Sequence, residues 1–477
     1  MFSFYTDWIH YDTPCKGRSN GSLWRIIMKK SSNRSASIQK RPRKVYYLIP
    51  GGLILIAGIV LLSLYLNGFF YNRRDVQVKT VSPGEDITSL SRNAKIVTSD
   101  MLSHSLSLLS KQMNTSPYLV SWYALPGSIS SITSLASEYI TSADQVNLLR
   151  CYVKNGNKDA AKGLAKAITD DFTGEGGYLV PVRKVSELAS AGTAQPIFPA
   201  NPAYEELPAL SACSMESTVE YLRALLEYYQ KWGQASDWAR IEKLAALLYS
   251  EDGTFFEDLT VLAAQPSLVP TGPGQDIVST VEGQVSTGGS FSTLTLASLD
   301  LEVFRMLSSA DSKYQPLYDK ALTILSGAMI SDDLPLFAIG FTQASAGYVY
   351  YNGDQIQADL VSSLEVTLHL AEEGKAPQKT ILWIKEQLYN QGLLYRSYDL
   401  ISGQATTDAE SVEAYGIILQ IARAVDDPDL YSKSLARLEW HLATNSTSAA
   451  RSTIFRQLDN SRVVVYAKDN LEALLGV

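Results

Sequence analysis

Few residues in this chain are of the types that most often carry enzyme chemistry. None of the four histidines stands in a metal-ligand spacing or a Ser-His-Asp pattern. The three cysteines fit neither a zinc motif nor a disulfide framework. These residues are His10, His104, His369 and His441, with Cys15, Cys151 and Cys213. We therefore expect no metal, no cofactor and no serine-hydrolase mechanism.

Acidic side chains at the starts of predicted helices are the remaining candidates. Asp144 and Asp300 both stand in such first turns. Each could face a substrate, but each could instead be a structural first-turn acid, because the helix dipole favours negative charge at its N-terminus. The residue types alone leave both interpretations open.

One sequence pattern that would position these acids occurs five times after about residue 140. A polar cluster opens an amphipathic helix, a short break follows, and a second helix returns. The first helices are expected to open near Ser142, Ser214, Ser292, Asp359 and Asp408, and their partners near Lys158, Ser236, Ser312, Ala376 and Pro428. This spacing predicts an all-α ring of helical hairpins, with any chemistry at the face where the first helices begin.

The ring needs closing elements and connecting loops. We expect a helix over residues 98–111, against which residues 463–477 close the ring. Two long segments, 171–212 and 251–290, are rich in Gly, Pro and Ser and read as functional loops. Short strands are expected near residues 178–183 and 347–351.

Residues 45–72 carry no charge, and their central run is long enough to cross a hydrocarbon core of about 30 Å as a helix. Aromatic residues stand at both ends, as at membrane interfaces. The alternative is a cleaved signal peptide, but the run is long for one and no clear cleavage site follows. We interpret the segment as a transmembrane helix.

The distribution of charged residues on either side of the predicted membrane helix indicates its orientation in the membrane. Residues 1–44 hold ten Lys or Arg against two acids, while the remainder carries 31 basic and 47 acidic residues, about −16. The positive-inside rule places the N-terminus in the cytoplasm and the rest outside, at the plasma membrane. A region with this much negative charge is expected to bind nucleic acid poorly. The expected order is a basic tail (1–44), a membrane helix (45–71), a stalk (72–95) and one extracellular domain (96–477).

Several short motifs in the same order resemble glycoside hydrolase family 8, most closely its membrane-anchored members in Gram-positive bacteria. TSADQ at 141–145 resembles the family's Ser-Glu-x-Gln helix start, and SLDLEVF at 298–304 its Tyr-Ile-Asp-Leu start. SMESTVEYLR at 214–223 is similar to its Asp-Asp-Leu-Arg-Ile-x-Arg helix. The C-terminal motifs are LYRSYD at 394–399, Gly403, ESVEAY at 410–415 and DNLEALL at 469–475. The likeness covers roughly residues 95–477.

The resemblance implies an (α/α)6 barrel that hydrolyses a β-linked glucan-like polysaccharide with inversion. That reaction needs a carboxylic acid and a carboxylate about 6.5–9.5 Å apart. By matching position Asp300 is the base, but the acid position holds Ala143. The acids that hold the bound sugar in the family fall on Ser217 and Thr218. The general base is therefore kept, and the general acid is missing.

Another acid could replace it. Asp144 is one residue along, about 100° round the helix and so turned from the cleft. Glu138, Glu175 and Glu216 are further candidates.

Sugar contacts are expected from aromatic and acidic side chains. Tyr395, Tyr398 and Glu410 match positions near the cleft, and Tyr178, Tyr204 and Tyr348 could also stack on sugar rings. Amphipathic packing, helix capping and core hydrogen bonding compete with each of these roles.

Three hypotheses follow. The first is a membrane-anchored protein that binds or guides a β-linked exopolysaccharide beside its synthase, with catalysis weakened or lost. The second is an active inverting endoglycanase that uses a displaced acid such as Asp144. The third is a protein-interaction scaffold in an envelope assembly, with a vestigial groove.

Overall fold

The computed structural model describes residues 57–59, 73–79, 83–110, 117–125, 135–188, 214–250, 253–255, 258–261, 290–350, 357–458 and 462–477. The chain forms two compact units, Met1–Phe69 and Phe70–Val477. Among the described residues no helix is long and apolar enough to cross a membrane. The transmembrane segment expected at 45–71 lies outside them, except for three residues.

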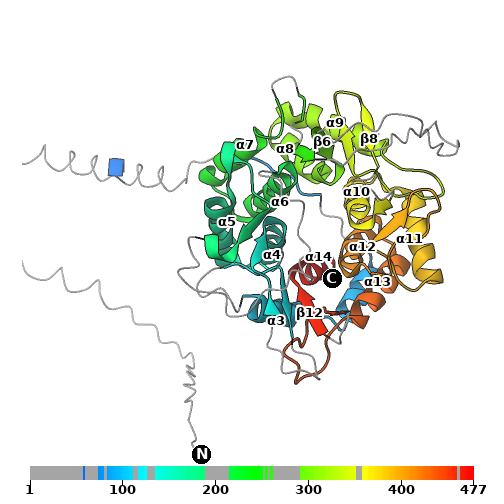
Figure 1. Cartoon of the computed structure of the whole chain (residues 1–477). Helices are drawn as coiled ribbons and strands as arrows, with labels where there is room; N and C mark the ends of the chain where they lie inside the picture. Colours follow the sequence, from blue (N-terminus) through cyan, green and yellow to red (C-terminus); the bar gives the residue numbers. More distant parts are fainter. Residues whose placement is uncertain are drawn as a thin grey trace, which may run out of the picture. The chain divides into compact units, whose positions relative to one another are not determined.

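Helices dominate the second unit and form two concentric rings (Figure 1). The inner ring consists of α4 (Ser142–Lys154), α6 (Met215–Trp232), α8 (Leu301–Ala310), α10 (Leu360–Glu372), α12 (Val412–Val425) and α14 (Ala467–Gly476). Each inner helix contacts the next, and α14 contacts α4, so this ring is closed. Outside it lie α3 (Thr98–Leu109), α5 (Lys158–Phe172), α7 (Ala235–Ala245), α9 (Gln315–Ser326), α11 (Gln378–Asn390) and α13 (Pro428–Trp440).

Short antiparallel strands add to the helices. One sheet has the order β11 (Arg456–Leu458), β12 (Arg462–Tyr466), β1 (Trp122–Ala124), β2 (Leu135–Ala136). A second runs β5 (Asp258–Val261), β6 (Ser290–Thr295), β7 (Gly340–Thr342), β8 (Gly347–Val349). Two pairs are β3 (Tyr139–Thr141) with β4 (Val182–Lys184), and β9 (Gln357–Asp359) with β10 (Ser397–Asp399). β4 and β8 lie where strands were expected.

Side-chain caps explain about half of the helix starts among the described residues. Ser214 and Asp359 accept hydrogen bonds from the first-turn amides of α6 and α10. Asp427 caps α13, whose first residue is Pro428, a position where the missing amide hydrogen has no cost. The starts of α4, α5 and α13 coincide with the predicted ones.

The hairpin expected at Ser292 begins later than predicted. Residues 290–295 form β6, a 3-10 turn (Leu296–Ser298) follows, and α8 begins only at Leu301. β6 pairs with β5 on one side and with β7 on the other. A segment that is hydrogen-bonded to strands on both sides is extended and cannot be helical, and this explains the later helix start. α12 likewise begins at Val412, four residues after the expected Asp408.

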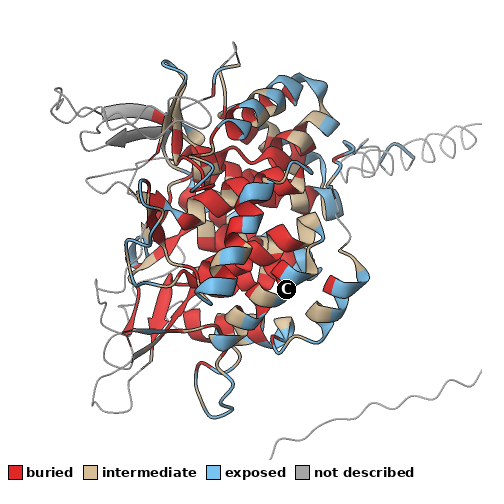
Figure 2. Cartoon of the chain, turned by 90° about the vertical axis from the view of Figure 1, so that its right-hand side faces the viewer, coloured by how far each residue is buried: buried red, intermediate tan, exposed pale blue. Residues whose placement is uncertain are grey.

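The ends of the domain meet as predicted. α14 packs against α3, and Ser105 Oγ donates to Asn470 Oδ1 at 3.3 Å. β12 pairs with β1, next to this contact. Buried residues lie in the interior of the domain, and exposed residues lie on its periphery (Figure 2).

The interval expected to be a stalk contains α2 (Glu85–Arg92), which contacts α13. Ile87 of α2 is fully buried. The Gly84 amide donates to Asp426 Oδ1 at 2.7 Å, and the Arg73 guanidinium binds the Tyr229 carbonyl. These residues are therefore packed against the domain rather than extended away from it.

Candidate functional site: an acidic cavity inside the inner ring

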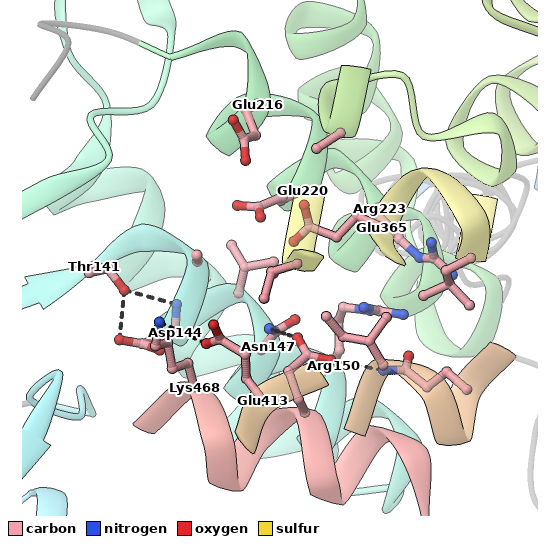
Figure 3. Close-up of a pocket in the computed structure, with 18 of the residues that line it drawn as sticks. Thr141, Asp144, Asn147, Arg150, Glu216, Glu220, Arg223, Glu365, Glu413 and Lys468 are labelled. Carbon is pink, nitrogen blue, oxygen red and sulfur yellow. Dashed lines mark hydrogen bonds and ion pairs between the residues drawn. The ribbon is translucent and has the colours of Figure 1, made fainter. Parts of the chain in front are cut away.

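A cavity of about 550 Å³ lies inside the inner ring, and helices α4, α6, α10, α12 and α14 and the start of α8 contribute to its lining (Figure 3). Its polar lining residues include eight acids and four bases. The acids are Asp144, Glu216, Glu220, Asp300, Asp359, Glu365, Glu413 and Glu472, and the bases are Arg150, Arg223, Arg396 and Lys468. The cavity is therefore net negative.

Helical spacing aims these side chains inward. On α6, Glu216, Glu220 and Arg223 are separated by four and three residues, which places them in a row on one face. Ala143 and Asn147 on α4, and Glu365 and His369 on α10, repeat that spacing of four. Helices α4, α6, α10, α12 and α14 thus each turn one face to the cavity, whereas α8 contributes only its N-cap residue Asp300.

The position that matches the family's acid, Ala143, does line the cavity. Asp144 also lines it, although it was expected to turn away. Thr141 Oγ1 donates to Asp144 Oδ2 at 2.7 Å and accepts from the Asp144 amide at 3.1 Å. Burial raises the pKa of Asp144 to about 7, against the lowering effect of the Thr141 hydrogen bond. Asp144 can therefore hold a proton near neutrality, with one oxygen engaged by Thr141.

Asp300 is both a helix cap and a cavity residue, so the two interpretations made from the sequence coexist. Its Oδ1 accepts from the Val303 amide at 3.2 Å, and its Oδ2 accepts from Arg223 Nη1 at 2.9 Å. Burial opposes ionisation, but the charge of Arg223, helped by His369, outweighs it and lowers the pKa of Asp300 to about 2. Asp300 is a stable carboxylate with a weak affinity for protons.

Arg223 connects Asp300 to a wider network. Its guanidinium also bonds Glu372, with Nη1 3.0 Å from Oε2, and Nε lies 3.3 Å from Glu227 Oε1. Asp300, His369 and Glu372 lie close enough together to hold a metal ion. The Arg223 guanidinium already binds the two carboxylates of this group, so the positive charge they require is supplied by the protein.

Carboxylates that the sequence comparison did not single out make up most of the acidic lining. Glu472 on α14 accepts from Asn147 Nδ2 at 2.6 Å and from Gln420 Nε2 at 2.8 Å. Glu413 on α12 pairs with Lys468 at 2.7 Å. Glu220 on α6 and Glu365 on α10 also point into the cavity (Figure 3). The spacing of Glu216, Glu220 and Arg223 on one face of α6 is the sequence signal that could have identified Glu220.

Ser217 and Thr218 lie outside the cavity lining, on another face of α6 from Glu216 and Glu220. Both are buried. Thr218 Oγ1 donates to the Ser214 carbonyl at 2.7 Å and accepts from the Leu179 amide at 3.0 Å. The hydroxyl thus fastens a loop to the helix start.

The remaining predicted sugar contacts are likewise not among the cavity residues. Tyr398 is 2% exposed, packs edge-on against Trp383, and accepts from the Tyr395 amide. Glu410 accepts from both Nε and Nη2 of Arg437, at 2.6 and 2.7 Å, and from Tyr415 at 2.7 Å.

Burial raises the pKa of Glu410, but His441, whose Nε2 lies 3.3 Å from Oε1, and the hydrogen bonds from Arg437 and Tyr415 outweigh burial and lower the pKa to about 2. These contacts give Glu410 a structural role, since its carboxylate holds the Arg437 and Tyr415 side chains.

The other candidates are placed as follows. Tyr178 and Tyr348 donate to the Leu247 and Ile324 carbonyls and are not among the cavity residues. Glu138 is also not among them. Tyr204, and the side chain of Glu175, lie outside the described part of the chain. Of the aromatic side chains in the described part of the chain, Trp122 and Tyr466 line the cavity.

No protein-family model matches the chain, and a search of curated proteins finds no similar sequence. Solved structures do match. An alpha-amylase from Clostridium perfringens is 21% identical with a TM-score of 0.57, covering 79% of this chain and 96% of its own. PssZ from Listeria monocytogenes is 12% identical with a TM-score of 0.49, covering 80% and 96%.

A reducing-end-xylose releasing exo-oligoxylanase complexed with xylobiose is 12% identical with a TM-score of 0.45, covering 83% and 96%. The fold assignment depends on the amylase, the most similar of the three in fold. The chain therefore shares the fold of this alpha-amylase, and the closed ring of helical hairpins is the fold that the resemblance to glycoside hydrolase family 8 implied.

Proposed function

We propose that this protein binds a polysaccharide in the cavity of its inner ring and hydrolyses it slowly or not at all. The observation that carries the proposal is Ala143, which lines the cavity of a glycosidase fold at the position where the family's acid would stand. A methyl group there donates no proton, and positioned proton transfer is typically worth about 10²–10⁴-fold in rate.

The state of the base supports the same conclusion. Asp300 lines the cavity, but Arg223 and the Val303 amide already engage both of its oxygens. Its low pKa makes it a poor acceptor of the proton of an attacking water. A site of this kind still offers hydrogen-bond acceptors to sugar hydroxyls.

Charge narrows the class of ligand. Eight acids against four bases line the cavity, so anionic polysaccharides would be repelled. Among the similar structures one enzyme is an alpha-amylase and another is complexed with xylobiose. Neutral or cationic glycans, whether α- or β-linked, therefore suit the cavity best, and this widens the β-linked class implied by the sequence.

The cellular setting is also a proposal. The uncharged segment 45–72 and the basic residues before it would anchor the chain in the plasma membrane with the ring outside. There it would meet an exopolysaccharide as the polymer leaves a membrane synthase, and it would guide the polymer rather than degrade it.

A second candidate function is hydrolysis by a displaced acid. Asp144 favours it, because this residue lines the cavity and burial raises its pKa to about 7. An acid–base pair with separated pKa values, Asp144 above and Asp300 below, is the pattern of a working glycosidase. The Thr141 hydrogen bond at one oxygen of Asp144 counts against it.

Calorimetric titration of the full chain with soluble starch, xylohexaose and mixed-linkage β-glucan tests the binding. We expect at least one of the three to bind. Ala143→Trp should abolish that binding, because the indole would fill the cavity. Ala239→Trp, at an exposed position of the outer helix α7, is the matched control and should bind normally. Absence of binding to all three, or unchanged binding by Ala143→Trp, would refute the proposal.

A further inference from the structure

Among the described residues that line the cavity, two carboxyl groups differ from the others because they make no hydrogen bond or ion pair with the described part of the chain. Glu220 on α6 and Glu365 on α10 project into the same part of the cavity (Figure 3). Within the described residues neither makes a hydrogen bond or an ion pair. Asp144, Asp300 and Glu472, by contrast, are each held by hydrogen bonds. The pair is thus the part of the acidic lining that is free to meet a ligand.

Helix geometry places this pair close to Asp300. Glu220 is three residues before Arg223 on α6, and Arg223 Nη1 lies 2.9 Å from Asp300 Oδ2. Residues three or four apart on a helix are neighbours on one face, about 5–6 Å apart at Cβ. On α6, therefore, Glu220 lies one helical turn from Arg223, which contacts the Asp300 carboxylate.

The facing helix gives the same result independently. Glu365 is four residues before His369 on α10, and His369 Nδ1 lies 3.7 Å from Asp300 Oδ1. Both carboxyls therefore stand one turn nearer the helix N-termini than the Asp300 carboxylate. A saccharide unit between them and Asp300 would have carboxyl groups on two sides, as inversion requires.

The pair also keeps a proton. Burial is the main cause that raises the pKa of Glu220 and of Glu365 well above the usual range, and the charge of Glu216 adds to it in both. Glu220 in turn raises the pKa of Glu365. Carboxylates at such close quarters cannot all ionise, so at least one proton remains on the pair near neutrality.

A buried imidazole nitrogen provides a second sign of a ligand. His369 is 7% exposed and lines the cavity, and its Nε2 lies 3.0 Å from the Ala297 carbonyl. Nε2 therefore carries a proton toward that carbonyl. Nδ1 has no hydrogen-bond partner among the described residues. A water bound between Nδ1 and Asp300 would satisfy it and would lie on the far side of the saccharide from the pair.

We propose that the Glu220–Glu365 pair is the proton donor of a slow glycosidic hydrolysis in this cavity, with Asp300 as the base. The inference goes beyond the proposed function, which requires binding alone, and it rests on that binding.

In the step, a carboxyl proton of the pair passes to the glycosidic oxygen as the bond from C1 to that oxygen breaks. A water attacks C1 from the opposite face and loses its proton to Asp300. One saccharide gains a hydroxyl and the other an inverted hemiacetal, and the proton on Asp300 returns through solvent to the pair. The weak basicity of Asp300 keeps the rate low.

The test measures reducing-end release by the full chain from soluble starch, xylohexaose and mixed-linkage β-glucan, with binding of the same three followed by calorimetry. We expect slow release from a probe that binds. The double variant Glu220→Gln, Glu365→Gln should release at least about 100-fold more slowly, with its Kd within about threefold of the parent. Glu386→Gln, an exposed acid on the outer helix α11, is the control and should release at the parent rate.

Each alternative outcome decides the question. Binding without any release refutes this inference and leaves the proposed function standing. Release that survives the double variant, or that is lost in Asp144→Asn instead, assigns the donor elsewhere and also refutes it. If none of the three probes binds, the proposed function fails and the inference fails with it.

Discussion

Asp144 and Asp300 lie in one cavity, and their surroundings move their pKa values in opposite directions. Burial raises the pKa of Asp144 to about 7, whereas the charge of Arg223 overcomes burial and brings that of Asp300 to about 2. Residue type alone could not distinguish them, because both are first-turn aspartates. The difference comes from Arg223, which stands on another helix 77 positions earlier.

Thr218 tests whether the residues matched to the family's sugar-binding acids are structural here. Thr218→Val removes the hydroxyl that accepts from the buried Leu179 amide, so we expect a loss of about 1–3 kcal/mol in the free energy of unfolding. Saccharide binding should not change. Denaturant unfolding and calorimetry measure the two effects.

Thr173→Val is the control, because Thr173 is exposed and its hydroxyl only returns to the Thr169 carbonyl. It should change stability by less than about 0.5 kcal/mol. Weaker saccharide binding by Thr218→Val, at unchanged stability, would instead restore Thr218 to the site.

The cavity carboxyls should make stability depend on pH. The folded state raises the pKa of Glu220 and Glu365, so between the ordinary pKa of Glu and these raised values it binds more protons than the unfolded chain. Stability therefore falls as pH rises through that interval. We expect a lower melting temperature at pH 8 than at pH 5. The double variant Glu220→Gln, Glu365→Gln should have a flatter profile.

Asp300 and Glu410 act in a different pH interval. Their pKa values are lowered to about 2, so the stability they contribute is present above the ordinary carboxyl pKa and is lost as pH falls toward 2. A melting temperature that rises from pH 5 to pH 8 in the parent chain would contradict the assignment of raised pKa values to the cavity pair.

The sequence motifs placed Ala143 and Asp300, and both line the cavity. The same motifs directed attention to Ser217 and Thr218, which do not line it. A match of short motifs assigns a role to a position, but a shift of one residue turns a helical side chain by about 100° and changes its face. Glu216 was named as a candidate acid and does line the cavity, but Glu220, one helical turn further on, was missed.

At the scale of the elements, polar capping residues in the sequence predicted well where some inner-ring helices begin. Ser214 and Asp359 are such residues. The start of α8 was misplaced because residues 290–295 pair with β5 and β7, which lie before and after them in the chain. Strand pairing is a tertiary effect that a local helix pattern does not reveal.

Close approach of α12 to α14 depends on a glycine that the sequence did not single out. A Cβ on Gly416 would lie 2.5 Å from the Glu472 carbonyl carbon and 2.7 Å from the Ala473 amide nitrogen. Gly416→Ala should therefore force the helices apart and cost about 1–3 kcal/mol of unfolding free energy. Because α14 carries Glu472, saccharide binding should weaken as well.

Gly163→Ala on the outer helix α5 is the matched control. Nothing lies within 4 Å of the Cβ it would gain, so the substitution should stabilise the protein by about 0.5–1 kcal/mol through helix propensity. Chemical denaturation of the two variants beside the parent checks both signs. Equal effects of the two alanines would contradict the packing described between α12 and α14.

At the scale of the whole molecule, the ring closes through elements that are far apart in the chain. α14 contacts both α3 and α4, so the C-terminal helix completes the cavity that α4 begins. This closure was predicted from the sequence. The position of α2 on α13 was not, because residues 72–95 are mostly polar and, among the described ones, only Val76 and Ile87 are buried apolar side chains.

The most direct test of the account is the rate of reducing-end release by Ala143→Glu, compared with the parent chain, from the polysaccharide that binds best. Position 143 lines the cavity, so a glutamate there should supply the missing acid opposite Asp300 and raise the rate at least about 100-fold. A folded Ala143→Glu chain that binds the polysaccharide and releases it no faster than the parent would contradict the account.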